Sequence, residues 1–229
     1  MTGAIVVLLA AGEGERIGRG PKAFLEIAGR PILSVAAEAA AACPEVDGLV
    51  VAVPPGAEDR AAAMLPAAKP AAVVAGGRGR QESVRLSLDA VPADAPVVVC
   101  HDSARPFAAP ELFTSVIEAL ADADGVVPAL PPFDTVKQVR DGYVEATLPR
   151  EDIRLAQTPQ AFAAAALRDA HRRAAEAGVV RTDDAALLEW AGYRVRVVAG
   201  EPVNFKITSP DDLARAERFL LDHPSVAGV

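Results

Sequence analysis

Residues 4–22 read AIVVLLAAGEGERIGRGPK. The first six are apolar and mostly Val and Leu, which is typical of a short strand buried on both faces of a parallel sheet. A glycine-rich stretch follows directly, so it lies beyond the carboxyl end of that strand. Ligands bind at this edge of an open α/β sheet, where glycines let backbone N–H groups approach phosphate oxygens. This stretch therefore predicts both a fold class and the edge of the sheet that carries the site.

The same alternation continues along the chain. Further short Val-rich runs bounded by turn residues predict strands at 49–53, 72–74, 97–100, 126–130 and 194–198. Stretches with helical periodicity lie between and after them, at 32–42, 58–65, 82–91, 110–121, 163–177, 183–190 and 211–221. Strands alternating with helices are typical of an α/β fold, here a mainly parallel twisted sheet with helices on both faces and each strand buried.

Length and composition narrow the class of protein. The 229 residues are most simply one domain, spanning 1–229. Hydrophobic residues make up 51% of the chain and charged residues 24%, which excludes a disordered or collagen-like protein. The formal charge of −8 argues against a nucleic-acid partner, because a polyanionic duplex repels an acidic surface.

Cysteine content and hydropathy indicate a soluble cytoplasmic protein. Cys43 and Cys100 are too few for a disulfide scaffold, and neither has a Cys or His partner at metal-ligand spacing. No apolar run approaches the roughly 20 residues that cross a bilayer, so we expect no membrane partner. The apolar residues 5–11 lack the preceding cationic region of a signal peptide.

One segment departs from the α/β pattern. Residues 134–148, DTVKQVRDGYVEATL, alternate polar and apolar side chains around Asp141-Gly142, a strong hairpin signal. The two strands are too polar to be core, which suggests a projecting arm. An isolated pair of strands is marginally stable in water, so we expect the arm to pack against a second subunit. A surface hairpin on its own domain is the alternative.

The glycine loop after the first strand matches neither of two common nucleotide-binding motifs. Ile17 stands where G-x-G-x-x-G requires Gly, and no G-x-x-x-x-G-K-[ST] occurs. The loop does carry Arg16 and Lys22, two cations suited to neutralising a triphosphate. The alternative is a simple turn between a strand and a helix.

A second glycine-bearing turn, GGRGRQESV at residues 76–84, precedes a predicted helix. This position would place Ser83 in the first helical turn, among free N–H donors that could face a nucleotide. It could touch a base or a ribose. Equally, Ser83 could be a helix-terminus hydroxyl with no ligand.

The motif HDSARP, residues 101–106, directly follows a predicted strand. Its carboxylate, Asp102, would face the cleft, and magnesium prefers one or two carboxylates together with phosphate oxygens and water. Asp102 is therefore a candidate Mg²⁺ ligand. Alternatively, Arg105 pairs with Asp102 structurally, and His101 is more simply a hydrogen-bonded structural residue than a catalyst.

Other polar residues are less informative individually. Lys206 lies in NFKIT, residues 204–208, between a strand and the last helix, and this position could return it to the cleft. Arg150, Thr158 and the segment 182–184 are indistinguishable by themselves from surface or capping residues.

Several motifs together resemble one known family. They are LAAGEGERIG followed by PK, GGRGRQESV, HDSARP, DTVK, TPQAF, TDDA and NFKIT, in this order between residue 4 and about residue 222. The series resembles the 2-C-methyl-D-erythritol 4-phosphate cytidylyltransferase family. Its members make 4-diphosphocytidyl-2-C-methylerythritol and pyrophosphate from CTP and the methylerythritol phosphate, in the non-mevalonate route to isoprenoid precursors.

The resemblance implies a Rossmann-like nucleotidyltransferase domain and a homodimer formed through the arm at about 133–150. It implies Mg²⁺ or another divalent cation, held by Asp102. The implied catalytic residues are Arg16, Lys22, Asp102 and Lys206. The implied CTP contacts are Ala10, Ala11, Gly12, Gly14, Ser83, Asp102, Ser103, Arg105 and Lys206.

For the sugar phosphate, the resemblance implies contacts from Thr135 and Arg150 on the partner's arm, and from Thr158 and Thr182. Ser103 departs from the family pattern, where Ala is frequent, and Asp184 stands where Glu often follows Thr-Asp. Neither change removes a charge that the chemistry needs. Two other hypotheses stay open: a cytidylyltransferase for another polyol phosphate, such as ribitol 5-phosphate, and a non-catalytic nucleotide-binding module.

Overall fold

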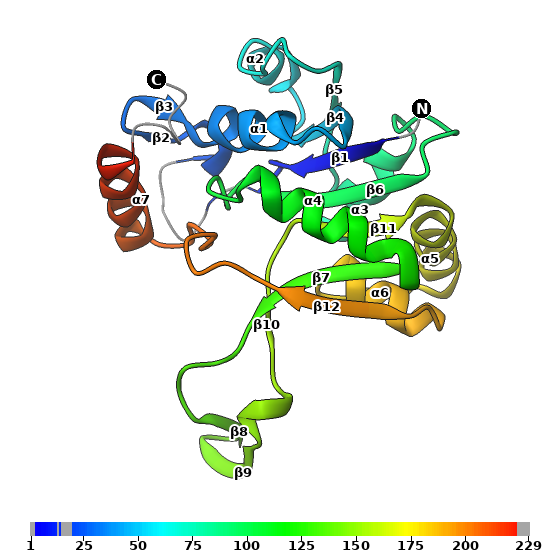
Figure 1. Ribbon diagram of the computed structural model, residues 1–229, viewed down its shortest axis with the longest axis vertical. Coiled ribbons are helices and arrows are strands. Elements are labelled where there is room, and N and C mark those ends of the chain that lie inside the picture. The colour runs from blue at the N-terminus through cyan, green and yellow to red at the C-terminus, as the bar shows by residue number, and fades with distance from the viewer. Residues whose placement is uncertain (1–2, 13, 15–19, 224–229) are drawn as a thin grey trace.

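The computed structural model describes residues 3–12, 14 and 20–223. Its central sheet consists of β1 (Ala4–Leu9), β4 (Val46–Val53), β5 (Ala71–Ala75), β6 (Val97–Asp102), β7 (Gly125–Leu130), β10 (Leu155–Ala156), β11 (Gln160–Ala163) and β12 (Val195–Ala199). The strand order is β10, β7, β11, β6, β1, β4, β5. Strand β12 also pairs with β7, outside this order. Figure 1 shows the helices on both sides of this sheet.

The helices are α1 (Ile32–Ala42), α2 (Glu58–Ala62), α3 (Arg80–Leu88), α4 (Pro110–Glu118), α5 (Ala164–Ala177), α6 (Asp184–Ala191) and α7 (Pro210–Asp222). Three short 3-10 turns are η1 (Lys22–Phe24), η2 (Ala119–Asp122) and η3 (Arg150–Asp152). Two small antiparallel pairs stand apart from the main sheet: β2 (Glu26–Ile27) with β3 (Arg30–Pro31), and β8 (Val136–Arg140) with β9 (Tyr143–Leu148).

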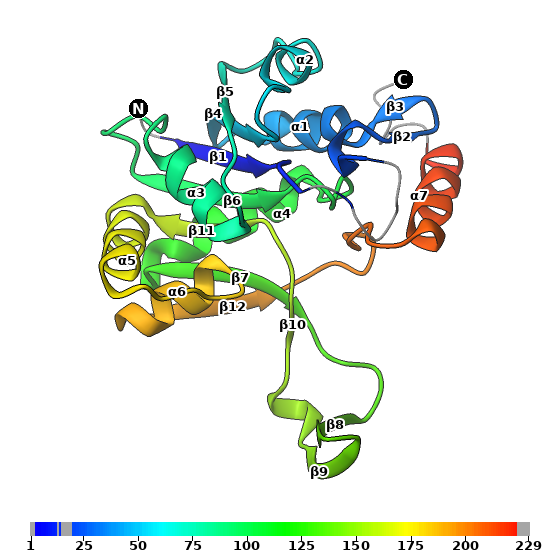
Figure 2. The ribbon, with the colours of Figure 1, turned by 180° about the vertical axis from the view of Figure 1, so that it is seen from behind.

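Strand β1 is apolar throughout because both faces of the sheet are covered. Side chains alternate along a strand, so Val6 and Leu8 pack against α1 and α4, whereas Ile5 and Val7 pack against α3, α5 and α6. Figures 1 and 2 show these two helical layers from opposite sides. The predicted α/β fold class is therefore confirmed.

Two details of the sheet differ from the prediction. β6, β1, β4 and β5 are parallel, as are β7 and β12, but β11 runs antiparallel between β6 and β7. Its sequence, QAFA, is too short to show a period, and we predicted no strand there. The prediction that each strand is buried on both faces is wrong for β5 and β12, which are largely exposed because they are edge strands.

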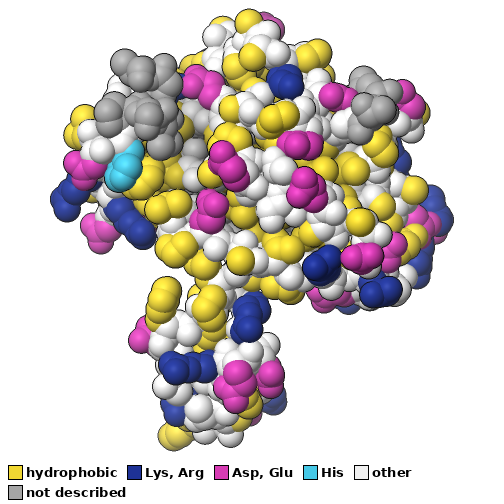
Figure 3. All heavy atoms as spheres, in the orientation of Figure 1, with side chains coloured by type: hydrophobic (Ala, Val, Ile, Leu, Met, Phe, Trp, Pro, Cys, Tyr) yellow, Lys and Arg dark blue, Asp and Glu magenta, His cyan; other side chains and the backbone are white. Residues whose placement is uncertain are grey.

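The predicted hairpin is present as β8 and β9. Asp141 and Gly142 have φ values of 49° and 84°, and positive φ at both central residues is the requirement of the tight turn that suits a hairpin. The pair projects from the body as an arm, and Figure 3 shows apolar side chains gathered at the end of the arm nearest the body. Val139, Tyr143 and Val144 are 56%, 79% and 60% exposed.

A third apolar cluster holds α7 against the β2–β3 pair. It includes Ile27, Phe107, Ile207 and Leu213. Ile207 lies between Lys206 and α7, so this cluster brings the segment before α7 next to the loop that follows β6.

None of the helices in the described part of the chain is long and apolar enough to cross a membrane.

Candidate active site

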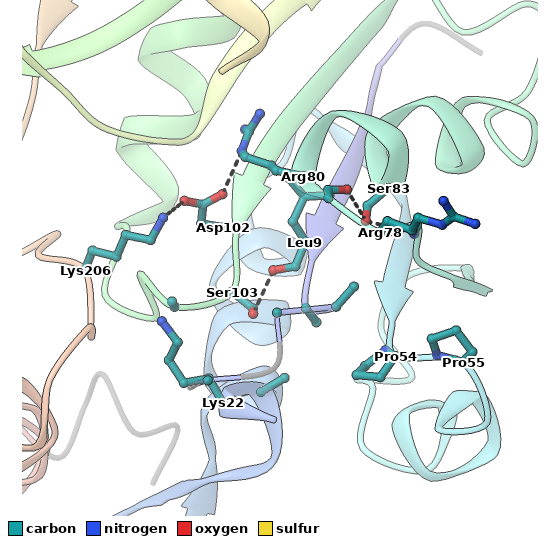
Figure 4. A pocket seen from close by; sticks show the side chains of 18 residues that line it. Leu9, Lys22, Pro54, Pro55, Arg78, Arg80, Ser83, Asp102, Ser103 and Lys206 are labelled. Atoms are coloured by element: carbon teal, nitrogen blue, oxygen red, sulfur yellow. Dashed lines mark hydrogen bonds and ion pairs between the residues drawn. The ribbon is translucent and has the colours of Figure 1, made fainter. Parts of the chain in front are cut away.

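Loops from distant parts of the chain enclose a pocket of about 550 Å³ at the carboxyl ends of β1, β5 and β6. The pocket lies at the edge of the sheet that the sequence indicated. It brings together most of the predicted site residues, namely Ala10, Ala11, Gly12, Gly14, Lys22, Ser83, Asp102, Ser103 and Lys206. Figure 4 shows the side chains of Lys22, Asp102 and Lys206 reaching the pocket from separate elements.

The two glycine loops touch each other, and glycine is required at the contact. A Cβ at Gly76 would lie 2.3 Å from the Cβ of Ala11, closer than two carbon atoms can approach. Gly14 has a φ of 72°, and a Cβ there would lie 2.5 Å from the carbonyl oxygen of Gly20. These glycines therefore allow backbone segments next to the pocket to approach each other more closely than side chains would permit.

Two serines hold the backbone around the pocket. The Ser83 hydroxyl accepts a hydrogen bond from the backbone N–H of Gly77 (3.0 Å) and donates to the carbonyl of Gly79 (2.9 Å). The Ser103 hydroxyl donates to the carbonyl of Leu9 (2.9 Å), which joins the ends of β6 and β1. Each oxygen keeps acceptor capacity, but its hydrogen is already used. Contact of either serine with a nucleotide stays a prediction.

Asp102 ends β6 and lies between two cations. Its Oδ1 is 3.3 Å from Nε of Arg80, and its Oδ2 is 2.5 Å from Nζ of Lys206 (Figure 4). Burial alone would raise the pKa of this carboxyl, since the side chain is largely buried, but the charges of Arg80 and Lys206 outweigh burial and hold the pKa well below its ordinary value. The pocket therefore contains an ionised carboxylate at neutral pH.

Lys22 and Lys206 reach the pocket from opposite ends of the sequence. Nζ of Lys22 donates to the carbonyl of Ile207 (3.1 Å), and the N–H of Ile207 donates to the carbonyl of Ala104 (2.8 Å). The segment that carries Lys206 is thereby attached both to Lys22 and to the loop after β6. The arrangement concentrates positive charge around one carboxylate, as an anionic ligand requires.

Arg80 is a pocket residue that sequence reasoning missed. It is the first residue of α3 and lines the pocket, and besides Asp102 it binds Asp184 through Nη1 (2.5 Å). The signal was present, because Arg80 lies in the quoted motif GGRGRQESV at the start of a helix. The predicted arginine of the next motif, Arg105, does not line the pocket and donates to the carbonyls of Asn204 (2.8 Å) and Ala156 (3.5 Å).

Comparison with known proteins identifies the family. The family model IspD, 2-C-methyl-D-erythritol 4-phosphate cytidylyltransferase, matches residues 4–222. The chain belongs to this family. It is 43% identical to the 2-C-methyl-D-erythritol 4-phosphate cytidylyltransferase of Thermus thermophilus, over 93% of this chain and 94% of that protein.

Other relatives agree. The chain is 47% identical to the bifunctional enzyme IspD/IspF of Anaeromyxobacter dehalogenans over 98% of its own length, and it spans 58% of that longer relative. The crystal structure of 4-diphosphocytidyl-2C-methyl-D-erythritol synthase from Anaerococcus prevotii is similar, with a TM-score of 0.86 and 30% identity, covering 96% of this chain and 99% of that one.

In this IspD-family chain, Thr158 is not among the residues that line the pocket and lies behind Asp102. His101 is fully buried, and burial lowers its pKa to about 4, so the imidazole is neutral. Its Nε2 is 3.1 Å from the carbonyl oxygen of Arg105 and must therefore carry the ring hydrogen. Nδ1 then accepts from the Thr158 hydroxyl (3.0 Å), whose oxygen accepts from the N–H of Asp102 (3.0 Å). The Thr158 hydroxyl thus holds the backbone of Asp102. The sequence did not indicate this role.

The remaining residues predicted for this IspD-family site are spread over the molecule. Thr135 and Arg150 are exposed residues of the arm segment, where Nη1 of Arg150 donates to the carbonyl of Phe133 (3.4 Å). Thr182 is exposed just before α6. Within one chain, neither these residues nor Arg105 line the pocket. Arg16 lies outside the described residues.

The described residues hold no cluster of three or more His, Cys, Asp or Glu side chains able to bind a metal. Asp102 is the carboxylate that lines the pocket. This donor set fits Mg²⁺ only together with ligand oxygens, because magnesium is commonly held by one or two carboxylates, substrate phosphates and water.

Proposed function

We propose that this chain transfers the cytidylyl group of CTP to 2-C-methyl-D-erythritol 4-phosphate and releases pyrophosphate. One observation carries the proposal: Lys206 and Arg80 pair with ionised Asp102 in a glycine-lined pocket, and Lys22, from a third distant segment, lines the same pocket. Such a pocket is suited to a ligand with many negative oxygens. The family to which the chain belongs identifies that ligand as CTP and the acceptor as the methylerythritol phosphate.

The reaction needs charge neutralisation more than a base. A phosphate monoester has its second pKa near 6, so the acceptor phosphate is already a dianionic nucleophile at neutral pH. One of its oxygens forms a bond to the α-phosphorus of CTP, the bond from that phosphorus to the bridging oxygen breaks, and pyrophosphate leaves with the electron pair. Two anions must approach each other and charge grows on the leaving group, so positioned cations lower the barrier.

The contacts on the chain suggest a division of roles. Backbone N–H groups of residues 10–12 and 14 approach the triphosphate, and Lys22 neutralises it; the family resemblance assigns the same role to Arg16, which lies outside the described residues. Lys206 lies on Oδ2 of Asp102 and contributes a second positive charge next to the reacting phosphates. Ser83 holds the second glycine turn against the nucleoside. These roles rest on the family resemblance and on the shared pocket.

Asp102 would hold a divalent cation, Mg²⁺ in the simplest case, jointly with the phosphates of CTP. When bound, the ion would neutralise phosphate charge and favour departure of pyrophosphate. Asp102 is a suitable ligand because its low pKa keeps it ionised.

The acceptor site is completed by a second subunit in our proposal. Thr135 and Arg150 lie on the arm segment, which projects from the body (Figure 2), and neither lines the pocket of its own chain. The arm segment also exposes large apolar side chains, including Phe133 and Tyr143, which are 78% and 79% exposed. A homodimer in which each arm reaches the partner's pocket would bury these side chains and supply the missing cation for the sugar phosphate.

Pyrophosphate release tests the function directly. The protein is supplied with CTP and Mg²⁺, and with methylerythritol phosphate, ribitol 5-phosphate or no acceptor. We expect release with the first acceptor alone. Release with ribitol 5-phosphate alone would identify the other polyol phosphate as substrate, and CTP binding without release under any condition would leave a non-catalytic nucleotide-binding module.

A further inference from the structure

A chain of hydrogen-bonded side chains leads from the pocket into the interior. Arg80 donates through Nε to Asp102 and through Nη1 to Oδ2 of Asp184. Oδ1 of Asp184 lies 3.0 Å from Nε2 of His171 on α5. Asp184 and His171 are 1% and 2% exposed, and neither lines the pocket, so neither can touch a ligand there.

The inner end of this chain is rigidly held. Asp184 is the first residue of α6, and the preceding residue, Asp183, caps the helix by accepting from the N–H of Ala186 (2.9 Å). The other carboxylate oxygen of Asp183 accepts from Nε2 of Gln160 in β11 (2.9 Å). The start of α6 is therefore tied to the central sheet, and it presents the Asp184 carboxylate to Arg80 from a fixed position.

The Arg80 guanidinium bridges two carboxylates. It donates to Asp102 through Nε and to Asp184 through Nη1, and Oδ2 of Asp102 pairs with Lys206. Nη2 of Arg80 is buried and has no hydrogen-bond partner among the described residues. Loss of the Asp184 charge would leave Nη1 poorly paired in addition to Nη2, and the guanidinium would have to move.

We propose that Asp184 and His171 are positioning residues of the nucleotide pocket: His171 orients Asp184, Asp184 holds the Arg80 guanidinium, and Arg80 in turn sets the position of the Asp102 carboxylate between two cations. The inference rests on the proposed function, because its effect is measured with CTP. It assigns a role to two buried side chains that make no contact with any substrate.

Asp184→Asn tests the proposal, with Asp211→Asn as its control. Both changes replace a carboxylate by an amide in the first turn of a helix, but Asp184 binds Arg80, whereas Asp211 is exposed in the first turn of α7. We expect Asp184→Asn to lower kcat/KM for CTP by about tenfold, as for a lost hydrogen bond to a charged group, while Asp211→Asn stays within about twofold of wild type.

Two readouts separate positioning from a general loss of structure. In an Asp102→Asn background, Asp184→Asn should have almost no further effect on kcat/KM, because its influence passes through Asp102. A crystal structure of Asp184→Asn should show the Arg80 guanidinium displaced. Full additivity of the two changes, or equal kinetics for Asp184→Asn and Asp211→Asn, would overturn the proposal.

If Asp184→Asn does not fold, variants of His171 test the proposal instead. His171→Leu removes the donor to Asp184, whereas His171→Gln keeps one. Lower kcat/KM in the leucine variant, restored by glutamine, supports the proposal, and wild-type kinetics in both contradict it. A wild-type chain that releases no pyrophosphate and binds no CTP would instead refute the proposed function, so the two failures are distinguishable.

Discussion

The pocket and the arm are opposite solutions to placing functional side chains. Asp102 is 8% exposed and is held through its carboxylate by Arg80 and Lys206 and through its backbone by Thr158. Arg150, on the arm segment, is exposed and binds one carbonyl of its own segment. The pocket therefore has a defined geometry in a single chain, whereas the arm can contribute to a site only when something else positions it.

The largest effect is expected inside the pocket. Lys22→Ala should lower kcat by about 10² to 10³, if loss of a cation resembles loss of an oxyanion-hole donor. Steady-state pyrophosphate release measures this. Lys69→Ala is the control, since Lys69 precedes β5 and so lies at the opposite edge of the sheet from the pocket. Near wild-type turnover for Lys22→Ala would remove Lys22 from the catalytic residues.

Subunit mixing tests whether the arm serves the partner. Arg150→Ala and Lys22→Ala are each expected to be poorly active, but a mixed dimer has one pocket with Lys22 that receives an intact arm. Equal mixing should restore about a quarter of wild-type turnover, since half the dimers are mixed and each has one working site. No recovery after verified subunit exchange would mean that the arm serves its own chain.

The hydrogen-bond chain behind Asp102 predicts a smaller effect. Thr158→Val leaves the N–H of Asp102 and Nδ1 of His101 buried and unpaired, which should destabilise the fold by about 1–3 kcal/mol and lower kcat by about tenfold. Urea unfolding and pyrophosphate release measure the two effects. Thr158→Ser keeps the hydroxyl and should restore both. Equal activity of the valine and serine variants would contradict the role assigned to these hydrogen bonds behind Asp102.

The smallest effect is expected at the tip of the arm. Gly142 has a φ of 84°, so Gly142→Ala should strain the turn by about 1 kcal/mol. We expect a modest rise in KM for the methylerythritol phosphate and no change in CTP affinity, because the CTP pocket lies in the body. Calorimetric titration with CTP provides the second measurement. Equal changes in the KM for the methylerythritol phosphate and in the Kd for CTP would contradict separate roles for the pocket and the arm.

Local patterns predicted most of the fold. Helix α1 occupies the expected residues 32–42, and the hairpin turns at Asp141-Gly142, because helical periodicity and turn chemistry depend on neighbouring residues. Strand β11 was not predicted, because four residues are too few to show a period. The surrounding sheet decides its antiparallel position between β6 and β7.

The candidate site was predicted in part. The glycine loops, Lys22, Asp102 and Lys206 could be proposed because they lie near the ends of predicted strands, and the family resemblance decided between a site and the structural alternatives. Arg80 was missed although it lies in a quoted motif. The buried pair of Asp184 and His171 could not be selected, since a single carboxylate or histidine in a helix is ordinarily a surface or structural residue. Contact with substrate at Thr135, Thr158 and Thr182 stays a prediction.

By itself, the sequence determined the α/β class, the edge of the sheet that carries the pocket and the presence of a projecting hairpin. Each follows from periodicity and turn residues close together in the chain. Only the tertiary structure decided which charges meet: Asp102 pairs with Arg80 and Lys206 and not with its neighbour Arg105. Electrostatic energy depends on distance in space and on burial, and neither quantity can be read from spacing along the chain.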